Sequence, residues 1–151
     1  MDNIDVSGIG LSGILTADKT FPAGVAISAF SDDLDPVDIV EKEYTNQAVG
    51  LNGHLITWTT AQNVELALGI IPGTEEEANL DILQAANFPV RGVKPAIDSI
   101  NLTLTYPDGS IDTYKNGRVK AGTPGRSVAA GGRRKSRVYR FVFESVVHSA
   151  A

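Results

Sequence analysis

The glycine-rich stretch GIGLSG, residues 8–13, is the first motif in this sequence that could carry chemistry. It matches the G-x-G-x-x-G pattern of dinucleotide-binding loops, and Asp32 and Asp33 follow near the distance expected for a ribose contact. That chemistry requires a buried strand before the loop and a helix after it. Here a polar segment precedes the motif, and the residues that follow disfavour a helix: Thr16, Thr20, Pro22 and Gly24. The motif therefore predicts turn glycines and no nucleotide site.

The stretch GGRRKS, residues 131–136, has the ending of a phosphate-binding loop because Lys135-Ser136 matches its last two positions. Arg134 stands where that loop needs a glycine, and Ala129 stands where its first glycine belongs. A backbone with side chains at these positions cannot wrap closely around phosphate groups. No phosphate loop is predicted.

The acidic residues Asp33 and Asp35 could begin a calcium-binding loop. Such a loop needs an oxygen ligand at the position of Val37, a glycine at that of Asp38 and a closing glutamate at that of Tyr44. Three mismatches exclude the regular loop, and only a loose surface calcium site stays open.

Two histidines are the remaining candidates for catalysis. His54 lies beside a predicted hairpin turn, and His148 lies in the predicted tail. Neither is accompanied by a nucleophile-elbow sequence, and the chain lacks clustered metal-ligand spacing. The sequence therefore predicts no enzyme activity, no metal and no cofactor.

The length and composition of the chain limit the kinds of fold that it can form. The chain has 151 residues, 42% of them hydrophobic, which suits a single domain over residues 1–151. Residues 1–12 and 146–151 are expected to be ends that are flexible or become ordered only at an interface. There is no cysteine, and we find no secretion signal or membrane-spanning apolar run. We expect a protein that is soluble and intracellular when it is made.

Most of the predicted elements are strands, because apolar and polar residues alternate with a period of two. Residues 25–30 form the first predicted strand, and Asn52-Gly53 supplies two positive-φ residues for a hairpin over residues 44–60. Three further stretches place apolar side chains on one face: residues 64–70, 100–106 and 138–144. The alternation predicts a fold that is mainly β.

One flanking helix is predicted at residues 74–88. Thr74 and Glu77 match a capping box in which each side chain binds the other's backbone amide. The glutamates at 75–77 lie where the helix dipole favours negative charge, so we interpret them as capping residues without a catalytic role. The predicted buried stripe consists of Ala78, Ile82, Leu83 and Ala86.

Charge is divided unevenly along the chain. Residues 1–50 hold nine acids and two bases, whereas residues 101–151 hold three acids and nine bases. The acids concentrate in an acidic segment, residues 32–43, and the bases in a basic block: Arg133, Arg134, Lys135, Arg137 and Arg140. These two groups could pair within one molecule, between identical subunits, or not at all.

Three roles are open for the basic block. Nucleic-acid binding is disfavoured because the aromatic residues of the last predicted strand face away from Arg140 and because the net charge is −5. The alternatives are a solvated loop and a docking loop for an acidic protein surface. The acidic segment of this same chain is such a surface.

The order of these features resembles the tail tube proteins of contractile-tailed bacteriophages, over roughly residues 25–145. The resemblance is carried by DDLDPVDI, GLNGHLITW, IIPGTEEEANLDIL, LTLTYPDGSI and GRRKSRVYRFVFE. It implies an antiparallel β-sandwich or barrel-like tail-tube fold with one flanking helix. Copies of this fold would form hexameric rings, stacked into a tube that conducts the genome during ejection. A baseplate, tail-terminator or tail-tip protein that forms a discrete oligomer is the alternative.

The resemblance also implies partners and a place. The partners would be further copies of the chain, tail sheath and baseplate proteins, with DNA as non-specific passing cargo and no membrane insertion. The location would be the phage tail of the virion, after assembly in the host cytoplasm. The candidate contacts with another subunit or with the sheath are Asp32, Asp33, Asp35, Asp38, Glu41, Arg133, Arg134, Lys135 and Arg137.

Overall fold

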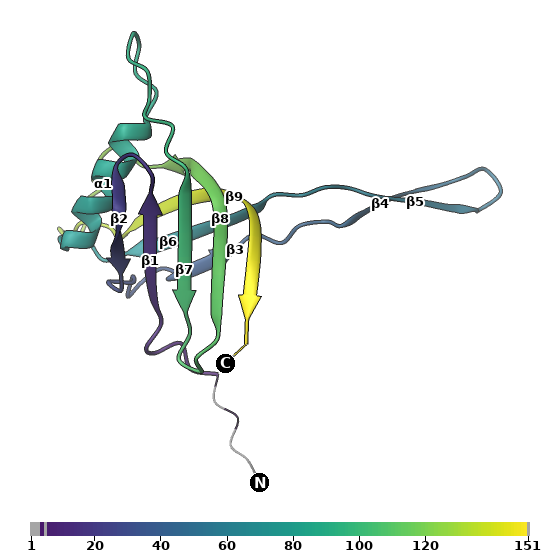
Figure 1. Ribbon diagram of the computed structural model, residues 1–151, viewed down its shortest axis with the longest axis horizontal. Coiled ribbons are helices and arrows are strands. Elements are labelled where there is room, and N and C mark those ends of the chain that lie inside the picture. The colour runs from purple at the N-terminus through teal and green to yellow at the C-terminus, as the bar shows by residue number, and fades with distance from the viewer. Residues whose placement is uncertain (1–3, 5, 151) are drawn as a thin grey trace.

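The computed structural model describes residue 4 and residues 6–150, in which there are nine strands and one helix (Figure 1). The predicted fold class, mainly β with antiparallel pairing and a single helix, is confirmed. The elements are β1 (Ser12–Ala17), β2 (Phe21–Ile27), β3 (Val37–Ile39), β4 (Thr45–Val49), β5 (Leu55–Thr59), β6 (Val64–Ile70), α1 (Glu75–Asn87), β7 (Ile100–Thr105), β8 (Ile111–Gly122) and β9 (Arg137–Ser149).

Seven strands form one antiparallel sheet in the order β2-β1-β7-β8-β9-β6-β3. The long strands β8 and β9 pair along most of their length, with a bulge between Val119 and Ala121, and the first half of β9 also pairs with β6. Bulges bend strands, and in Figure 1 the β1–β7–β8 part of the sheet crosses in front of the β6–β3 part. The sheet therefore folds over a core between its two parts, while β2 and β3 remain its unpaired ends within the described residues.

Alternating side chains build this core as the sequence predicted. Tyr139, Phe141 and Phe143 of β9 are each at most 2% exposed, and the ring of Tyr114 lies 5.4 Å from that of Phe143. Arg140, between these aromatic residues, is exposed on the other face, as predicted. β1, β2, β6, β7 and α1 complete the core with Leu15, Ala17, Ile27, Leu66, Leu68, Ile70, Leu80, Leu83, Ile100, Leu102 and Leu104.

The amino-terminal strands differ from the prediction. The sequence placed a first strand at residues 25–30, whereas the structure has β2 at Phe21–Ile27 and an earlier strand, β1, at Ser12–Ala17. β1 begins inside the GIGLSG stretch, so a strand and not a helix follows these glycines. The geometry of a dinucleotide loop is absent there, as the sequence indicated.

The carboxyl end also differs from the prediction. Residues 146–149, predicted to belong to a flexible or interface-ordered end, instead continue β9, where Val147 pairs with Thr113 and His148 with Asp112. The strand extends this far because the first half of β8 offers it a partner. Residues 1–3, 5 and 151 of the two predicted ends lie outside the described residues.

The helix lies where it was predicted, but a different face is buried. α1 begins after its N-cap Thr74 and ends at Asn87, and its buried side chains are Glu77, Leu80, Leu83 and Gln84. Ile82, predicted to be buried, is 54% exposed. Two polar residues replace apolar ones in the buried stripe because the surrounding loops supply them with hydrogen-bond partners.

The predicted hairpin forms a separate two-stranded sheet, β4 with β5, outside the seven-stranded one. Its turn is not the predicted two-residue type, because Asn52 does not adopt a positive φ and only Gly53 does, at 84°. The amide of Gly53 donates to the carbonyl of Gly50, and the amide of Gly50 donates to the carbonyl of His54. The loop therefore has three residues, 51–53, one more than predicted, and its last residue, Gly53, is the left-handed one.

A buried carboxylate joins the β1–β2 turn to the segment before β7. Asp98 is fully buried and accepts hydrogen bonds from the backbone amides of Lys19 and Thr20, the hydroxyl of Thr20 and the amide of Asn87. Burial raises the pKa of Asp98, but the hydrogen bonds from Thr20, Asn87 and the backbone outweigh it and hold the pKa below its ordinary value. The ionised carboxylate is thus the form that suits this site.

We expect Asp98→Asn to lower the free energy of unfolding at neutral pH by about 2 kcal/mol. The reason is that the new NH₂ group is a donor and would face donor groups whose hydrogen bonds the carboxylate accepted. The lowered pKa means that the native contribution is complete above the ordinary pKa of 3.8 and is lost as pH falls through the folded-state pKa. Urea unfolding across the acid range measures both effects. The variant should lose less stability on acidification than the native chain. Glu43→Gln, at an exposed carboxylate, is the control. If the free energies of unfolding of the Asp98 variant and of the native chain fall in parallel as the pH falls, the pH dependence does not come from Asp98.

A glycine in β8 makes room for the core aromatic residue opposite it. A Cβ added at Gly117 would lie 2.3 Å from a ring carbon of Phe143. We expect Gly117→Ala to lower the free energy of unfolding by about 1–3 kcal/mol through overpacking. Gly125→Ala is the matched control, because a Cβ there meets nothing within 4 Å. Equal thermal stability of the two variants would show that the ring moves away at no cost.

Candidate assembly surfaces

The basic block and the acidic segment meet within the molecule. The guanidinium of Arg133 binds the carboxylate of Asp32 through two hydrogen bonds, of 2.7 and 3.1 Å, and the hydroxyl of Ser136 donates to Asp33 at 2.6 Å. The hydrogen bond from Arg133 lowers the pKa of Asp32, and those from Ser136 and Ser31 lower the pKa of Asp33. Of the pairings that the sequence left open, the one within the chain is present at these residues.

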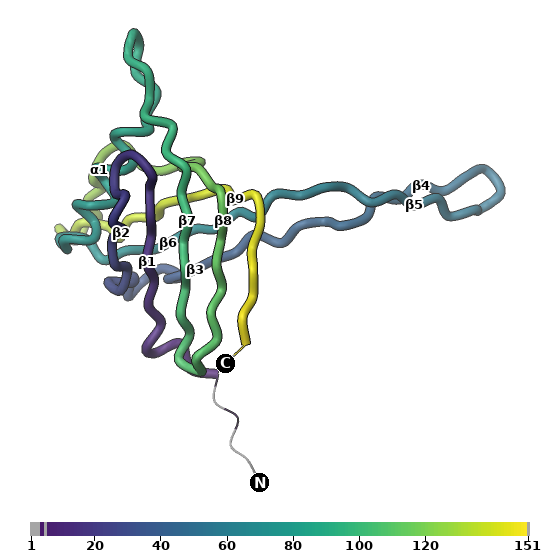
Figure 2. Tube along the Cα trace, viewed as in Figure 1, coloured from purple at the N-terminus to yellow at the C-terminus, as the bar shows by residue number. Residues whose placement is uncertain are grey.

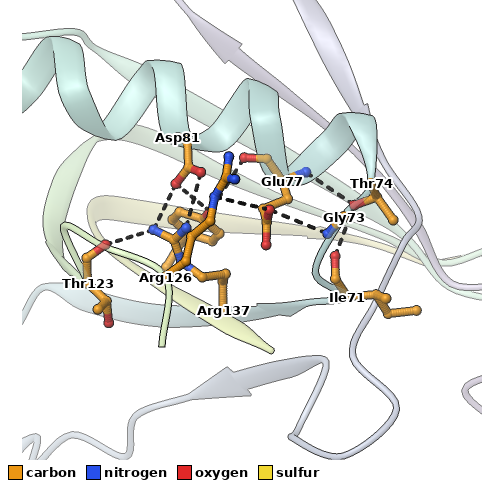
Figure 3. A network of polar contacts seen from close by, with 9 residues as sticks. Ile71, Gly73, Thr74, Glu77, Asp81, Thr123, Arg126 and Arg137 are labelled. Carbon is orange, nitrogen blue, oxygen red and sulfur yellow. Dashed lines mark hydrogen bonds and ion pairs between the residues drawn. The ribbon is translucent and has the colours of Figure 1, made fainter. Parts of the chain in front are cut away.

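Arg137 lies under α1 and is not available at the surface (Figure 3). Its side chain is 5% exposed, pairs with Asp81 at 2.8 Å and donates to the carbonyl of Thr123 at 2.7 Å. Its guanidinium carbon also lies 5.4 Å from the ring centre of Tyr139. The charge of Arg137 is therefore already paired inside the fold, and its predicted contact with another subunit stays a prediction.

The capping box at the start of α1 is confirmed in one half only. The hydroxyl of Thr74 accepts from the amide of Glu77 at 3.3 Å, as predicted. The carboxylate of Glu77, 3% exposed, accepts at 3.4 Å from the amide of Gly73 and not from that of Thr74 (Figure 3). Arg126 lies 4.0 Å from the same carboxylate. This glutamate has a structural place, in line with its interpretation as a capping residue.

The other candidate contacts lie on the surface. Asp35, Asp38 and Glu41 are exposed along β3 and the residues beside it, and Lys135 is exposed in the loop before β9. Arg134 is partly buried. Their role as contacts with another subunit or with the sheath stays a prediction, and the structure does not bring the three acids onto the basic loop as it does Asp32 and Asp33.

The catalytic candidates do not come together. His54 lies in the exposed tip of the hairpin, while His148 lies in β9 with its Nδ1 atom 2.6 Å from Asp112. In the described part of the chain no three His, Asp or Glu side chains gather closely enough to hold a metal. Among the described residues, α1 is also too short and too polar to cross a membrane.

The surface that sequence reasoning missed is the hairpin arm, residues 44–60. Figures 1 and 2 show β4 and β5 leaving the body as a long two-stranded extension of β3 and β6. It contains no Asp, Glu, Lys or Arg. Its large apolar side chains are each at least half exposed: Val49, Leu51, Leu55, Ile56 and Trp58. The sequence does carry a signal for this surface, because no Asp, Glu, Lys or Arg occurs in the twenty-one residues from Tyr44 to Val64.

The family model described as "Tail fiber protein gp32" matches residues 4–147 of this sequence. The chain belongs to the tail fiber protein gp32 family. A comparison with curated proteins finds no match to this gp32-family chain.

Solved structures share the fold of this gp32-family chain. One is a chain of the PVC sheath–tube complex of an extracellular contractile injection system, 17% identical, with a TM-score of 0.52 over 92% of this chain and 88% of that one. A second is a chain of the anti-feeding prophage baseplate, 8% identical, with a TM-score of 0.59 over 99% and 98%. A third is a chain of the PVC sheath/tube terminator, 16% identical, with a TM-score of 0.50 over 99% of both. The resemblance to contractile-tail proteins seen in the sequence is confirmed, at the level of the fold.

We expect Arg137→Gln to lower the free energy of unfolding of this gp32-family chain by about 3 kcal/mol, because it leaves Asp81 without its buried partner. Lys135→Gln, two residues away and exposed, should change it by no more than about 0.5 kcal/mol. Denaturant unfolding of the dilute protein measures both values. A small effect on stability at Arg137 together with lost oligomerisation would instead favour the predicted contact with another subunit.

Proposed function

We propose that this gp32-family chain is a structural subunit of a phage tail tube, which assembles with copies of itself into stacked hexameric rings around a lumen that conducts DNA. The role proposed is mechanical and not catalytic. Support comes from the family match over nearly the whole chain and from a fold shared with components of contractile injection systems. Within the proposal, assembly takes place in the host cytoplasm, and tail sheath and baseplate proteins are further partners.

The observation that carries this proposal is the hairpin arm. An isolated two-stranded hairpin is at best marginally stable in water, and this one shows exposed Leu51, Ile56 and Trp58 without a charged residue beside them. Large exposed apolar surfaces of soluble proteins mark sites of association. The arm extends away from its own core (Figure 1), so the surface that would cover it belongs to another chain.

The open ends of the sheet support the same proposal. β2 and β3 each pair on one side only within the described residues. Unpaired edges invite contact with another chain, so in a ring each of the two sheet ends can meet a neighbouring copy. Contacts of this kind at both ends would let the copies form the continuous wall that a tube requires.

A second candidate function is a baseplate, tail-terminator or tail-tip protein that forms a discrete oligomer. The observation in its favour is the TM-score of 0.59 to a baseplate chain, against 0.52 to the chain of the sheath–tube complex. Negative-stain electron microscopy of the concentrated full chain separates the two roles. Stacked rings or tubes support the tube subunit, and single rings or small oligomers of fixed size support the alternative.

We expect Ile56→Lys in the hairpin arm to raise the protein concentration needed for assembly by about tenfold or more, since it places a charge in an apolar contact. Ile82→Lys is the matched control, because Ile82 is 54% exposed on α1 and Ile56 is 55% exposed. Sedimentation velocity over a concentration series measures, for each variant, the protein concentration at which assembly begins. Both variants should unfold at native-like temperatures when dilute.

If the Ile56 and Ile82 variants need the same protein concentration to assemble, the hairpin arm is not an assembly contact and the proposal loses its main support. A native chain that stays monomeric at every concentration would reject self-assembly itself.

A further inference from the structure

One end of the large sheet carries acids and apolar residues together. This acidic edge consists of β3 and its flanks, with exposed Asp35, Asp38 and Glu41. Three apolar side chains lie among them and are 40–45% exposed: Leu34, Ile39 and Val40. β3 pairs with β6 on one side only, so the backbone groups on its other side are open within the described residues.

An apolar groove runs beside the acidic edge. Its walls come from the segment before β1, with Ile9 and Leu11, from β3 and the residue before it, with Pro36 and Ile39, and from Tyr106. The groove is open to solvent, and the exposed acids Asp35 and Asp38 are direct sequence neighbours of its lining residues Pro36, Val37 and Ile39. A partner suited to this part of the surface would bring apolar side chains for the groove and positive charge for the acidic edge.

A second protrusion of the molecule has this composition. Residues 88–97 leave the end of α1 and stand away from the body at the top of Figure 1. We call them the basic finger. Its tip is a tight turn in which the amide of Val93 donates to the carbonyl of Val90, with Gly92 at a φ of 79°. Val90 and Val93 are 52% and 64% exposed, and Phe88 at its base is 45% exposed.

The charges of the finger are free for a partner. Arg91 lies in the turn and Lys94 directly after it, and they are the only two bases between residues 51 and 100. Both are exposed, and neither has an acidic partner among the described residues. By contrast, Arg133 of the basic block is already bound to Asp32 of its own molecule.

We propose that the basic finger of one copy docks on the acidic edge of a second copy, with Val90 and Val93 against the apolar groove and with Arg91 and Lys94 facing Asp38 and Glu41. This contact rests on the self-assembly proposed above and names two surfaces that carry it. It explains why both surfaces combine charge with exposed apolar side chains: the apolar centre gives affinity, and the charged rim gives orientation.

The contact joins two different surfaces, so each copy has one of each to offer. Such a head-to-tail contact closes into a ring or continues as a helix. Exposed charge pairs are screened by salt, so assembly through this contact should weaken as the salt concentration rises. The hairpin arm carries no such charge and is not expected to respond in this way.

The test uses two charge-reversed full-length variants, R91E/K94E and D38K/E41K. Each presents like charge on both surfaces, so each alone should need about tenfold or more protein than the native chain to assemble at low salt. Mixed in equal amounts, the two should assemble near the native concentration, because every finger then meets an edge of opposite charge. The chain that carries all four reversals should also assemble alone. Sedimentation velocity measures these thresholds, and thermal unfolding of dilute samples checks the folding of each variant.

Failure of this contact is distinguishable from failure of self-assembly. If the native chain assembles and the two variants assemble equally well, the finger and the edge do not meet and the proposal is overturned. Variants that fail alone and also fail when mixed overturn it as well, because opposite charge did not restore the contact. A native chain that does not assemble rejects the proposed function, and this contact with it.

Discussion

The fold depends on β9, which belongs to both parts of the bent sheet. Its inward residues Tyr139, Phe141 and Phe143 fill the core between those parts, while its backbone pairs with β6 on one side and β8 on the other. Gly117 of β8 is needed because the ring of Phe143 occupies the space that a side chain there would take. α1 closes one side of the core with Leu80 and Leu83 and carries the carboxylate that binds Arg137 at the beginning of β9.

Much of this could be predicted from the sequence, because alternation reports directly which side chains face inward. The strands at residues 64–70, 100–106 and 138–144 and the helix at residues 74–88 were found in this way. β1 was missed because its glycines indicated a turn. The buried stripe of α1 was misplaced because Glu77 and Gln84 look like surface residues until the loops that bind them are known.

The candidate contacts were harder to predict because their pairing depends on the folded chain. Arg133 and Asp32 lie 101 positions apart, and nothing local shows that they meet. Arg137 looks like its neighbours in the basic block, yet the alternation that puts Tyr139 inside also puts Arg137 inside. For the hairpin arm, alternation could indicate a strand pair, but it could not tell whether a face is covered by its own chain, by another chain or by water.

The hairpin arm is continuous with β3 and β6, and β6 is held along its length by β9. Tension applied to a seated arm would therefore act along the strands and load many hydrogen bonds of the β6–β9 ladder at once, instead of opening them one after another. The pair of Lys42 with Glu65, 3.0 Å apart, ties the root of the arm to β6 at the point where such a load enters. Within the proposed assembly, an arm of this kind would pass a pull on to the whole β6–β9 ladder and would not peel away from the domain.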